Sequence, residues 1–267
     1  MIRSMGALLL FVLASGCAVR PGVHLGNSSP IVGEFVGPGL TANSVLQTFK
    51  FRFLNEDHHL DHVRLLEEGG SARALFGDAS PQDPWELTAD YLELAGIETM
   101  KKDMDCLSRE GFCDIDLGHD VVNGEFRFAL VGFEFQRING RDDHHIKAIG
   151  ILPIDNRLRV TFHDDSPGDD QFKCIVQYKL VPFNRESGFP VRLFKSGGNS
   201  RRIEEALGGD PDDRVLSGFQ FNYTHGGDAH VLALGVDVAS GTVSFQDNDT
   251  AEGISWDVTY LHLEDFR

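Results

Sequence analysis

Residues 49–53 read Phe-Lys-Phe-Arg-Phe, and the alternation returns as Gly-Phe-Glu-Phe at residues 132–135 and as Gly-Phe-Gln-Phe at residues 218–221. Successive side chains of a β-strand point to opposite faces, so phenylalanine at every second position predicts a strand with one buried aromatic face. The central phenylalanines Phe51, Phe133 and Phe219 recur at about 84-residue spacing. These stretches therefore predict a β fold whose pattern occurs three times.

Three further blocks follow each Phe-x-Phe stretch in the same order. The second block is Asp57-His58-His59, Asp143-His144-His145 or Asp228-Ala229-His230, each followed by an aliphatic run. The third is a short hydrophobic strand pattern, at residues 75–78, 160–164 and 243–247. The fourth alternates apolar and polar residues, at residues 85–91, 172–178 and 254–260, as a half-buried antiparallel strand does. Four ordered blocks occurring three times indicate an internal repeat.

The predicted fold class is all-β, with three tandem homologous antiparallel β-sandwich-like repeats packed with pseudo-threefold symmetry. Turn-forming Asp, Gly, Pro and Asn separate the blocks. The predicted division of the chain is a signal peptide at 1–16, a lipidated N-terminus and tether at 17–30, and β repeats at 31–96, 97–183 and 184–267.

The order of these strands resembles that of the H-type lectin domain, over residues 46–95, 127–182 and 214–264. The resemblance implies a small antiparallel sandwich, sugar binding and assembly as trimers, which three tandem copies would mimic within one chain. The Asp-His-His block does not match a motif of that family. The resemblance therefore carries no sugar-binding residue to this sequence and is an analogy of fold.

The N-terminus reads as an export signal. Arg3 precedes a short apolar run, which ends in Leu13-Ala14-Ser15-Gly16-Cys17. This stretch resembles the lipobox of bacterial lipoproteins, in which the cysteine thiol receives a diacylglycerol, although Ala14 stands where that family prefers leucine. The resemblance implies a bacterial cell-envelope protein that is lipid-anchored at Cys17, in the outer membrane if the host is Gram-negative. The alternatives are an ordinary signal cleaved nearby or a buried N-terminal helix.

Composition restricts the partners. The formal net charge of −17 repels phosphate backbones, so nucleic-acid binding and polybasic adhesion to anionic lipid are not expected. No later apolar run is long enough to span a bilayer, which leaves the N-terminal lipid as the expected membrane contact. Twenty phenylalanines against four tyrosines and two tryptophans indicate aromatic side chains used mainly for packing.

The remaining cysteines divide into a pair and a single residue. Cys106 and Cys113 lie close together in a loop-like stretch and are predicted to form a local disulfide in an oxidising compartment, with two free thiols as the alternative. Cys174 alternates with apolar neighbours and is predicted to be a small buried hydrophobe. No Cys-x-x-Cys pair supports a zinc ribbon or a thioredoxin-type site.

The histidine of the second block recurs in all three copies as His59, His145 and His230, whereas the histidine before it is replaced by Ala229 in the third. One interpretation is a histidine at the edge of the core that is hydrogen-bonded to its neighbouring aspartate, Asp57, Asp143 or Asp228. The others are a metal site with histidine and aspartate ligands, or a histidine that contacts a ligand or senses pH.

An acidic loop follows the third block of every copy and begins at Asp78, Asp164 or Asp247. Calcium prefers several oxygen ligands from such loops, but EF-hand spacing is absent, and the same residues form ordinary turns. Calcium is thus a candidate ligand of these loops, and no cofactor is expected to be required.

No catalytic motif is present in the sequence: it lacks Gly-x-Ser-x-Gly, a phosphate-binding glycine loop and a nucleophilic Cys-His setting. The leading hypothesis is a non-catalytic envelope lipoprotein with multivalent sites for a carbohydrate, because repeated weak sites gain avidity on a multivalent partner. The alternatives are a structural or envelope-assembly lipoprotein without a small ligand and a glycan-acting enzyme.

Overall fold

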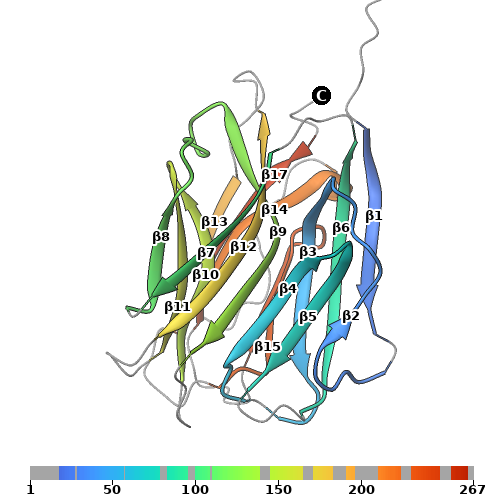
Figure 1. Ribbon diagram of the computed structural model, residues 1–267, viewed down its shortest axis with the longest axis vertical. Coiled ribbons are helices and arrows are strands. Elements are labelled where there is room, and N and C mark those ends of the chain that lie inside the picture. Colours follow the sequence, from blue (N-terminus) through green and yellow to red (C-terminus); the bar gives the residue numbers. More distant parts are fainter. Residues whose placement is uncertain are drawn as a thin grey trace, which may run out of the picture.

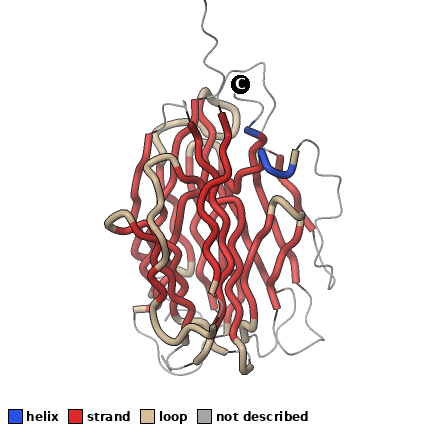
Figure 2. The backbone as a smooth tube through the Cα atoms, turned by 90° about the vertical axis from the view of Figure 1, so that its right-hand side faces the viewer, coloured by secondary structure: helices blue, strands red, loops and turns tan. Residues whose placement is uncertain are grey.

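A computed structural model describes residues 18–27, 29–56, 58–78, 83–95, 100–108, 110–138, 145–164, 171–182, 191–195, 210–223, 230–246 and 254–263. Several predicted features lie outside the described residues, namely the signal peptide at 1–16, Cys17, Asp57, Asp143, Asp228 and Asp247. The strands run along the long axis of the molecule, and loops gather at its two ends (Figure 2). The prediction of an all-β fold is confirmed.

Three antiparallel sheets build the molecule (Figure 1). The first sheet has the order β1 (Ala18–Gly26), β6 (Trp85–Ala95), β3 (Ser44–Phe53), β15 (Ala233–Asp237) and β16 (Thr242–Gln246). The second has the order β2 (Phe35–Val36), β5 (Ser71–Gly77), β4 (His62–Glu68), β9 (Phe126–Arg137), β12 (Phe172–Pro182) and β7 (Met100–Ser108). The third has the order β13 (Val191–Lys195), β17 (Ile254–His262), β14 (Arg214–Tyr223), β10 (Ile146–Ile154), β11 (Arg157–Asp164) and β8 (Phe112–Asp116). A short 3-10 turn, η1 (Pro211–Asp213), precedes β14.

Each sheet combines strands from two of the three predicted segments, so the segments are not separate sandwiches with their own sheets. The Phe-x-Phe strands β3, β9 and β14 each pair on one side with the closing strand of their own segment. On the other side they pair with a hairpin from another segment, as β3 with β15, β9 with β4 and β14 with β10. The physical reason is that a central strand has two hydrogen-bonding edges, and the neighbouring hairpin satisfies the second.

The phenylalanines of these strands meet in the core. Phe49, Phe133 and Phe219 come from three different sheets, and their ring centroids lie 5.0, 4.9 and 5.3 Å apart. All three side chains are fully buried. The sequence comparison matched Phe51 with Phe133 and Phe219. In the structure Phe49 is the residue that packs with these two, so the predicted match is two residues out of register. Such ring pairs contribute about 0.5–1.5 kcal/mol beyond their area burial.

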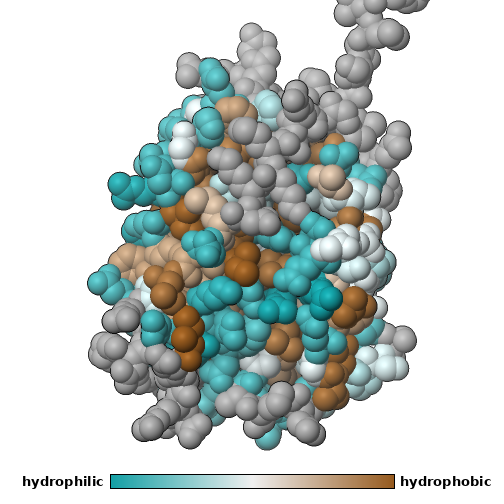
Figure 3. Space-filling model, in the orientation of Figure 1, coloured by the Kyte–Doolittle hydropathy of each residue, from teal (hydrophilic) through white to brown (hydrophobic). Residues whose placement is uncertain are grey.

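A second layer of aromatic pairs surrounds this triad. Each next phenylalanine on the strand faces a ring from the hairpin of its own segment: Phe51 and Phe76 at 5.2 Å, Phe135 and Phe162 at 5.5 Å, and Phe221 and Phe245 at 4.9 Å. The face of the molecule that Figure 3 shows is mostly hydrophilic with scattered apolar patches. This is the alternation that the Phe-x-Phe pattern predicts.

All three Phe-x-Phe strands carry a register shift against their closing strand, at Gln47, Val131 and Ser217. A β-bulge adds one residue to a strand and increases its twist. The buried Gln47 side chain also donates to the carbonyls of Pro211, at 3.0 Å, and Arg214, at 3.1 Å. The starting ends of β3 and β14 therefore lie together at one end of the molecule.

The N-terminal segment differs from the predicted tether at 17–30. Residues 18–26 form β1, which pairs with β6 from Ala18 opposite Ala95 to Gly26 opposite Thr88. The register shifts between Pro21 and His24. Proline is tolerated here because β1 is an edge strand, where one row of backbone donors needs no partner. The Pro and Gly content that predicted a tether instead marks an irregular edge strand.

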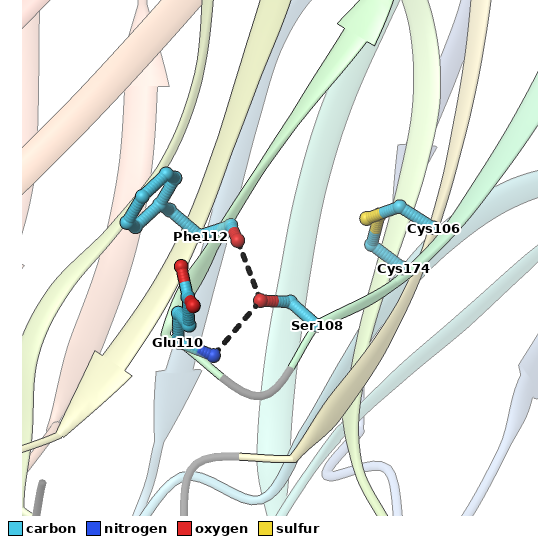
Figure 4. The surroundings of a disulfide bond; sticks show 5 residues. All are labelled: Cys106, Ser108, Glu110, Phe112 and Cys174. Atoms are coloured by element: carbon cyan, nitrogen blue, oxygen red, sulfur yellow. Dashed lines mark hydrogen bonds between the residues drawn. A yellow bond between two sulfur atoms is a disulfide. The ribbon is translucent and has the colours of Figure 1, made fainter. Parts of the chain in front are cut away.

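The disulfide prediction is also wrong. Cys106 pairs with Cys174, which lies directly opposite it where β7 and β12 pair, with the Cα atoms 5.2 Å apart (Figure 4). That separation lies in the range that a disulfide requires. Cys113 lies on β8, in another sheet, and is the free cysteine of the described residues. The prediction of a buried strand position for Cys174 is confirmed, but the residue is cross-linked.

A buried carboxylate joins the first two segments where β4 pairs with β9. Glu134 accepts hydrogen bonds from His62 Nε2, at 2.6 Å, and from Arg64 Nη2, at 2.7 Å. Its side chain is 2% exposed. Burial acts to raise the pKa of Glu134, but the hydrogen bonds from His62 and Arg64 outweigh it and hold the pKa below its usual value. The charged form is therefore the one that the fold requires.

The substitution Glu134→Gln should lower the free energy of unfolding at pH 7 by about 3 kcal/mol, because it breaks a buried ion pair. A carboxylate whose pKa is depressed on folding stabilises the protein above its unfolded pKa, and this contribution is lost as the pH falls through the folded value. The difference from wild type should therefore shrink below about pH 4. Urea unfolding from pH 7 to pH 3 measures this. A constant difference across that range would contradict the role of the charge.

Candidate functional site: a cluster of three histidines

The three recurring histidines meet at a single point. His59 lies beyond the end of β3, His145 precedes β10, and His230 lies beyond the end of β14. His59 Nε2 lies 2.5 Å from His230 Nε2. The ring centroids of His59 and His145 are 5.0 Å apart, those of His59 and His230 4.3 Å, and those of His145 and His230 5.4 Å. Each predicted segment thus contributes one imidazole to a single three-histidine cluster.

The residue after each histidine holds its backbone in place. Leu60, Ile146 and Val231 are all fully buried. Backbone hydrogen bonds then connect the segments: Val231 N donates to His58 O at 2.8 Å, and His58 N donates to Val231 O at 3.2 Å. The Tyr223 hydroxyl donates to the His230 carbonyl at 2.9 Å. The histidines are therefore positioned by packed and hydrogen-bonded backbone.

The cluster has the chemistry of a transition-metal site. Each histidine offers one ring nitrogen, and the three nitrogens lie within 4.8 Å of one another. All three residues are partly exposed, although the Nε2 atom of His145 is itself buried. Imidazole nitrogen suits zinc, copper, iron and nickel, whereas calcium requires oxygen ligands. Sequence reasoning identified each histidine as a candidate ligand, but it placed the three in separate sites. The signal that could have joined them is that the same histidine occurs once in each copy.

The predicted partners of these histidines, Asp57, Asp143 and Asp228, lie outside the described residues. Their hydrogen bonding to the imidazoles therefore stays a prediction.

The first histidine of the Asp-His-His block has a different role. His58 Nδ1 lies 2.9 Å from Asp78 Oδ2, and His58 Nε2 lies 3.1 Å from Asn55 Oδ1. Asn55 in turn donates to Asp83 at 2.9 Å. His58 thus holds the described ends of the first acidic loop together. Asp78 is therefore part of this network through His58.

The corresponding carboxylate of the second copy is engaged in the core. Asp164 is fully buried and accepts a hydrogen bond from Arg137 Nη1 at 2.8 Å. The Arg137 guanidinium also lies over the Phe162 ring, 4.9 Å from its centroid. Asp164 is therefore an ion-pair partner in the fold, and the calcium hypothesis for the acidic loops stays a prediction for their other members.

The substitution Asp164→Asn should lower the free energy of unfolding by about 3 kcal/mol, because it removes the carboxylate 2.8 Å from the buried Arg137 guanidinium and leaves Asp61, at 3.9 Å, as a more distant counter-charge. Urea unfolding with added calcium and with a chelator measures both the loss and its origin. A structural ion pair predicts a loss that is independent of calcium. Wild-type stability that falls in chelator, with no further fall in the variant, would instead make Asp164 a calcium ligand.

Comparisons with known proteins do not assign a family. No protein-family model matches the chain, and no curated protein matches its sequence. A solved structure, the major capsid protein P2 of bacteriophage PM2, is similar over 61% of this chain and 98% of its own length, at 10% identity and a TM-score of 0.23. A likeness at that score carries no argument about this protein. Within the described part of the chain, no helix has the length and apolar character needed to cross a membrane.

Proposed function

We propose that this chain is a lipid-anchored cell-envelope protein that binds one divalent transition-metal ion through His59, His145 and His230. The observation that carries the proposal is the convergence of three imidazole nitrogens, from three distant parts of the chain, within 4.8 Å. Three histidines are a known ligand set for zinc. The proposed role is binding, without a catalytic step.

The proposal includes a pseudo-threefold relation among the three segments. It is supported by the near-equal distances in the triad of Phe49, Phe133 and Phe219, and by the register shift that each strand carries at the equivalent position. Residues close to a threefold axis meet their own copies. A histidine repeated three times near such an axis therefore makes one site with three ligands, whereas a histidine far from the axis would make three separate sites.

The spacing of the ring nitrogens supports zinc as the proposed ion. Zinc–nitrogen bonds of about 2.0–2.1 Å at tetrahedral angles place ligand nitrogens about 3.3 Å apart. The His59 and His230 nitrogens, now 2.5 Å apart, need to separate by less than 1 Å, which small rotations of their rings supply. Three protein ligands leave a fourth position for water or for a donor atom from another molecule.

The position of the site relative to the anchor follows from the strands. Cys17, the proposed lipid site, directly precedes Ala18, which begins β1. Ala18 lies at the same end of the first sheet as the start of β3, because Ala18 pairs with Ala95 and Ser44 pairs with Glu93, both in the last residues of β6. His59 follows the other end of β3, which spans ten residues, or about 30 Å at the rise of a strand. β1 begins at the end of the body opposite the one at which β3 ends (Figure 1), so the proposed metal site would lie far from the proposed anchor.

Metal binding is tested with Ala18–Arg267 by calorimetric titration of zinc after treatment with chelator. We expect one zinc per chain, and His59→Ala, His145→Ala and His230→Ala should each weaken binding by more than about 100-fold, because removal of even an outer-shell partner costs 10–100-fold. His24→Ala is the matched control, since His24 is exposed and lies 2.6 Å from Asp90 on the outer face of the first sheet. Three zinc ions per chain, or an equal loss in the control, would contradict the proposal.

The same variants separate the metal role from the alternative of a structural histidine. If His145 is needed mainly for a buried hydrogen bond, His145→Ala should destabilise the metal-free protein by about 1–2 kcal/mol. A metal ligand predicts little loss without zinc and a clear loss of the stabilisation that zinc confers. Thermal unfolding with and without zinc distinguishes the two.

The anchor is tested by Cys17→Ser, which should move the protein from the membrane fraction to the soluble fraction, because the thiol that would carry the lipid is gone. Fractionation of cells that express the two forms measures this. Membrane association that persists in the variant would overturn lipidation at Cys17.

Multivalent carbohydrate binding stays a prediction from the sequence, as do a purely structural role and a glycan-acting enzyme. The convergence of the histidines limits which residues could form the carbohydrate-binding sites. Three separate sugar sites would have to be built from residues other than His59, His145 and His230, because these three share one location.

A further inference from the structure

The free cysteine lies beside the disulfide. The sulfur atoms of Cys106, Cys113 and Cys174 all lie within 4.8 Å of one another. Cys113 and Cys106 are partly exposed, whereas Cys174 is fully buried. Figure 4 shows the disulfide next to the connection between β7 and β8, in which Phe112 immediately precedes Cys113. A thiol and a disulfide are therefore close enough for small side-chain movements to bring them into contact.

Hydrogen bonds hold this arrangement in place. The Ser108 hydroxyl donates to the Phe112 carbonyl at 2.5 Å and accepts from the Glu110 backbone at 3.1 Å. Phe162 N donates to Gly111 O at 2.8 Å, which attaches the same connection to β11. β8 also pairs with β11, with Cys113 opposite Val160. The position of Cys113 relative to Cys106 is thus part of the folded structure.

We propose that Cys113, Cys106 and Cys174 form a thiol–disulfide exchange site. The Cys113 thiolate attacks the Cys106 sulfur, a Cys106–Cys113 bond forms, and the Cys106–Cys174 bond breaks. Cys174 leaves as a thiolate and takes up the proton that Cys113 released. One disulfide and one thiol are present before and after, so no external oxidant or reductant is needed. This inference is independent of the metal site.

The Cys113 thiolate attacks Cys106 and not Cys174, because Cys106 is partly exposed whereas Cys174 is fully buried. The exchange would move the cross-link. The Cys106–Cys174 bond joins two neighbouring strands within the second sheet, whereas a Cys106–Cys113 bond would join the edge strand of that sheet to the edge strand of the third. The two bonds thus constrain different parts of the molecule.

The surroundings of Cys113 keep the exchange slow at neutral pH. Burial and, to a lesser degree, the neighbouring Asp114 carboxylate raise the pKa of Cys113 to about 11. Asp114 is itself paired with Arg159 at 2.8 Å, which limits its effect on the thiol. Only the thiolate attacks a disulfide, so the Cys106–Cys174 form persists where Cys113 stays protonated.

Peptide mapping under non-reducing conditions tests the exchange. The folded protein is incubated at pH 9 without any added thiol, quenched with acid and alkylated in denaturant. We expect wild type to give Cys106–Cys113 peptides together with alkylated Cys174, and Cys113→Ser to keep Cys174 protected. Alkylation of Cys174 to the same extent in Cys113→Ser would overturn the proposal, since opening of the native disulfide would then not need Cys113.

A second variant tests the geometry alone. In Cys174→Ser, Cys113 is the cysteine that remains near Cys106 among the described residues. We expect this variant to fold and to form the Cys106–Cys113 disulfide in an oxidised glutathione buffer. A folded Cys174→Ser protein that keeps two free thiols there would overturn the proposal, because the two sulfurs would then be unable to meet. Zinc titration of the same samples reports on the metal site separately.

Discussion

The packing of Phe49, Phe133 and Phe219 against one another is the constraint on which the rest of the structure depends. Each ring comes from the central strand of a different sheet, and a buried aromatic side chain removes about 150–250 Å² from water. The three strands can bury these rings only if their sheets close around a common interior. The outer pairs, such as Phe51 with Phe76, then fill the space between neighbouring sheets.

This closure explains why no segment keeps its own sheet. Once β3, β9 and β14 face the interior, each has one edge beside its own closing strand and one edge beside a hairpin from another segment. Every sheet therefore depends on two segments, and an isolated segment would expose both an aromatic face and an unpaired strand edge. Cooperative unfolding of the whole body follows from this arrangement, in contrast to solenoid repeats that contact only their neighbours.

The residue two positions after the outer phenylalanine differs among the three strands β3, β9 and β14. Phe53 packs on Phe76, Arg137 lies over Phe162 and pairs with Asp164, and Tyr223 packs on Phe245 while its hydroxyl binds the His230 carbonyl. Each side chain covers the aromatic ring of its hairpin, so the packing role is common and the polar contacts differ. A guanidinium in this buried place requires a carboxylate, which accounts for the burial of Asp164. The histidines are alike in all three copies although this neighbouring position differs, which sets them apart from residues needed only for packing.

The sequence by itself determined the strands of the recurring blocks, because the period of two in Phe-Lys-Phe-Arg-Phe and in the closing blocks is a local property of the chain. It also determined which histidine recurs and which side of each strand is apolar. Only the tertiary structure decided which strands share a sheet, that Cys106 lies opposite Cys174, that residues 18–26 join the first sheet, and that His59, His145 and His230 meet. The physical reason is that these features depend on contacts between residues far apart in the chain, which arise when the three aromatic strands bury their phenylalanines together. Local periodicity carries no information about which distant strand supplies the second edge.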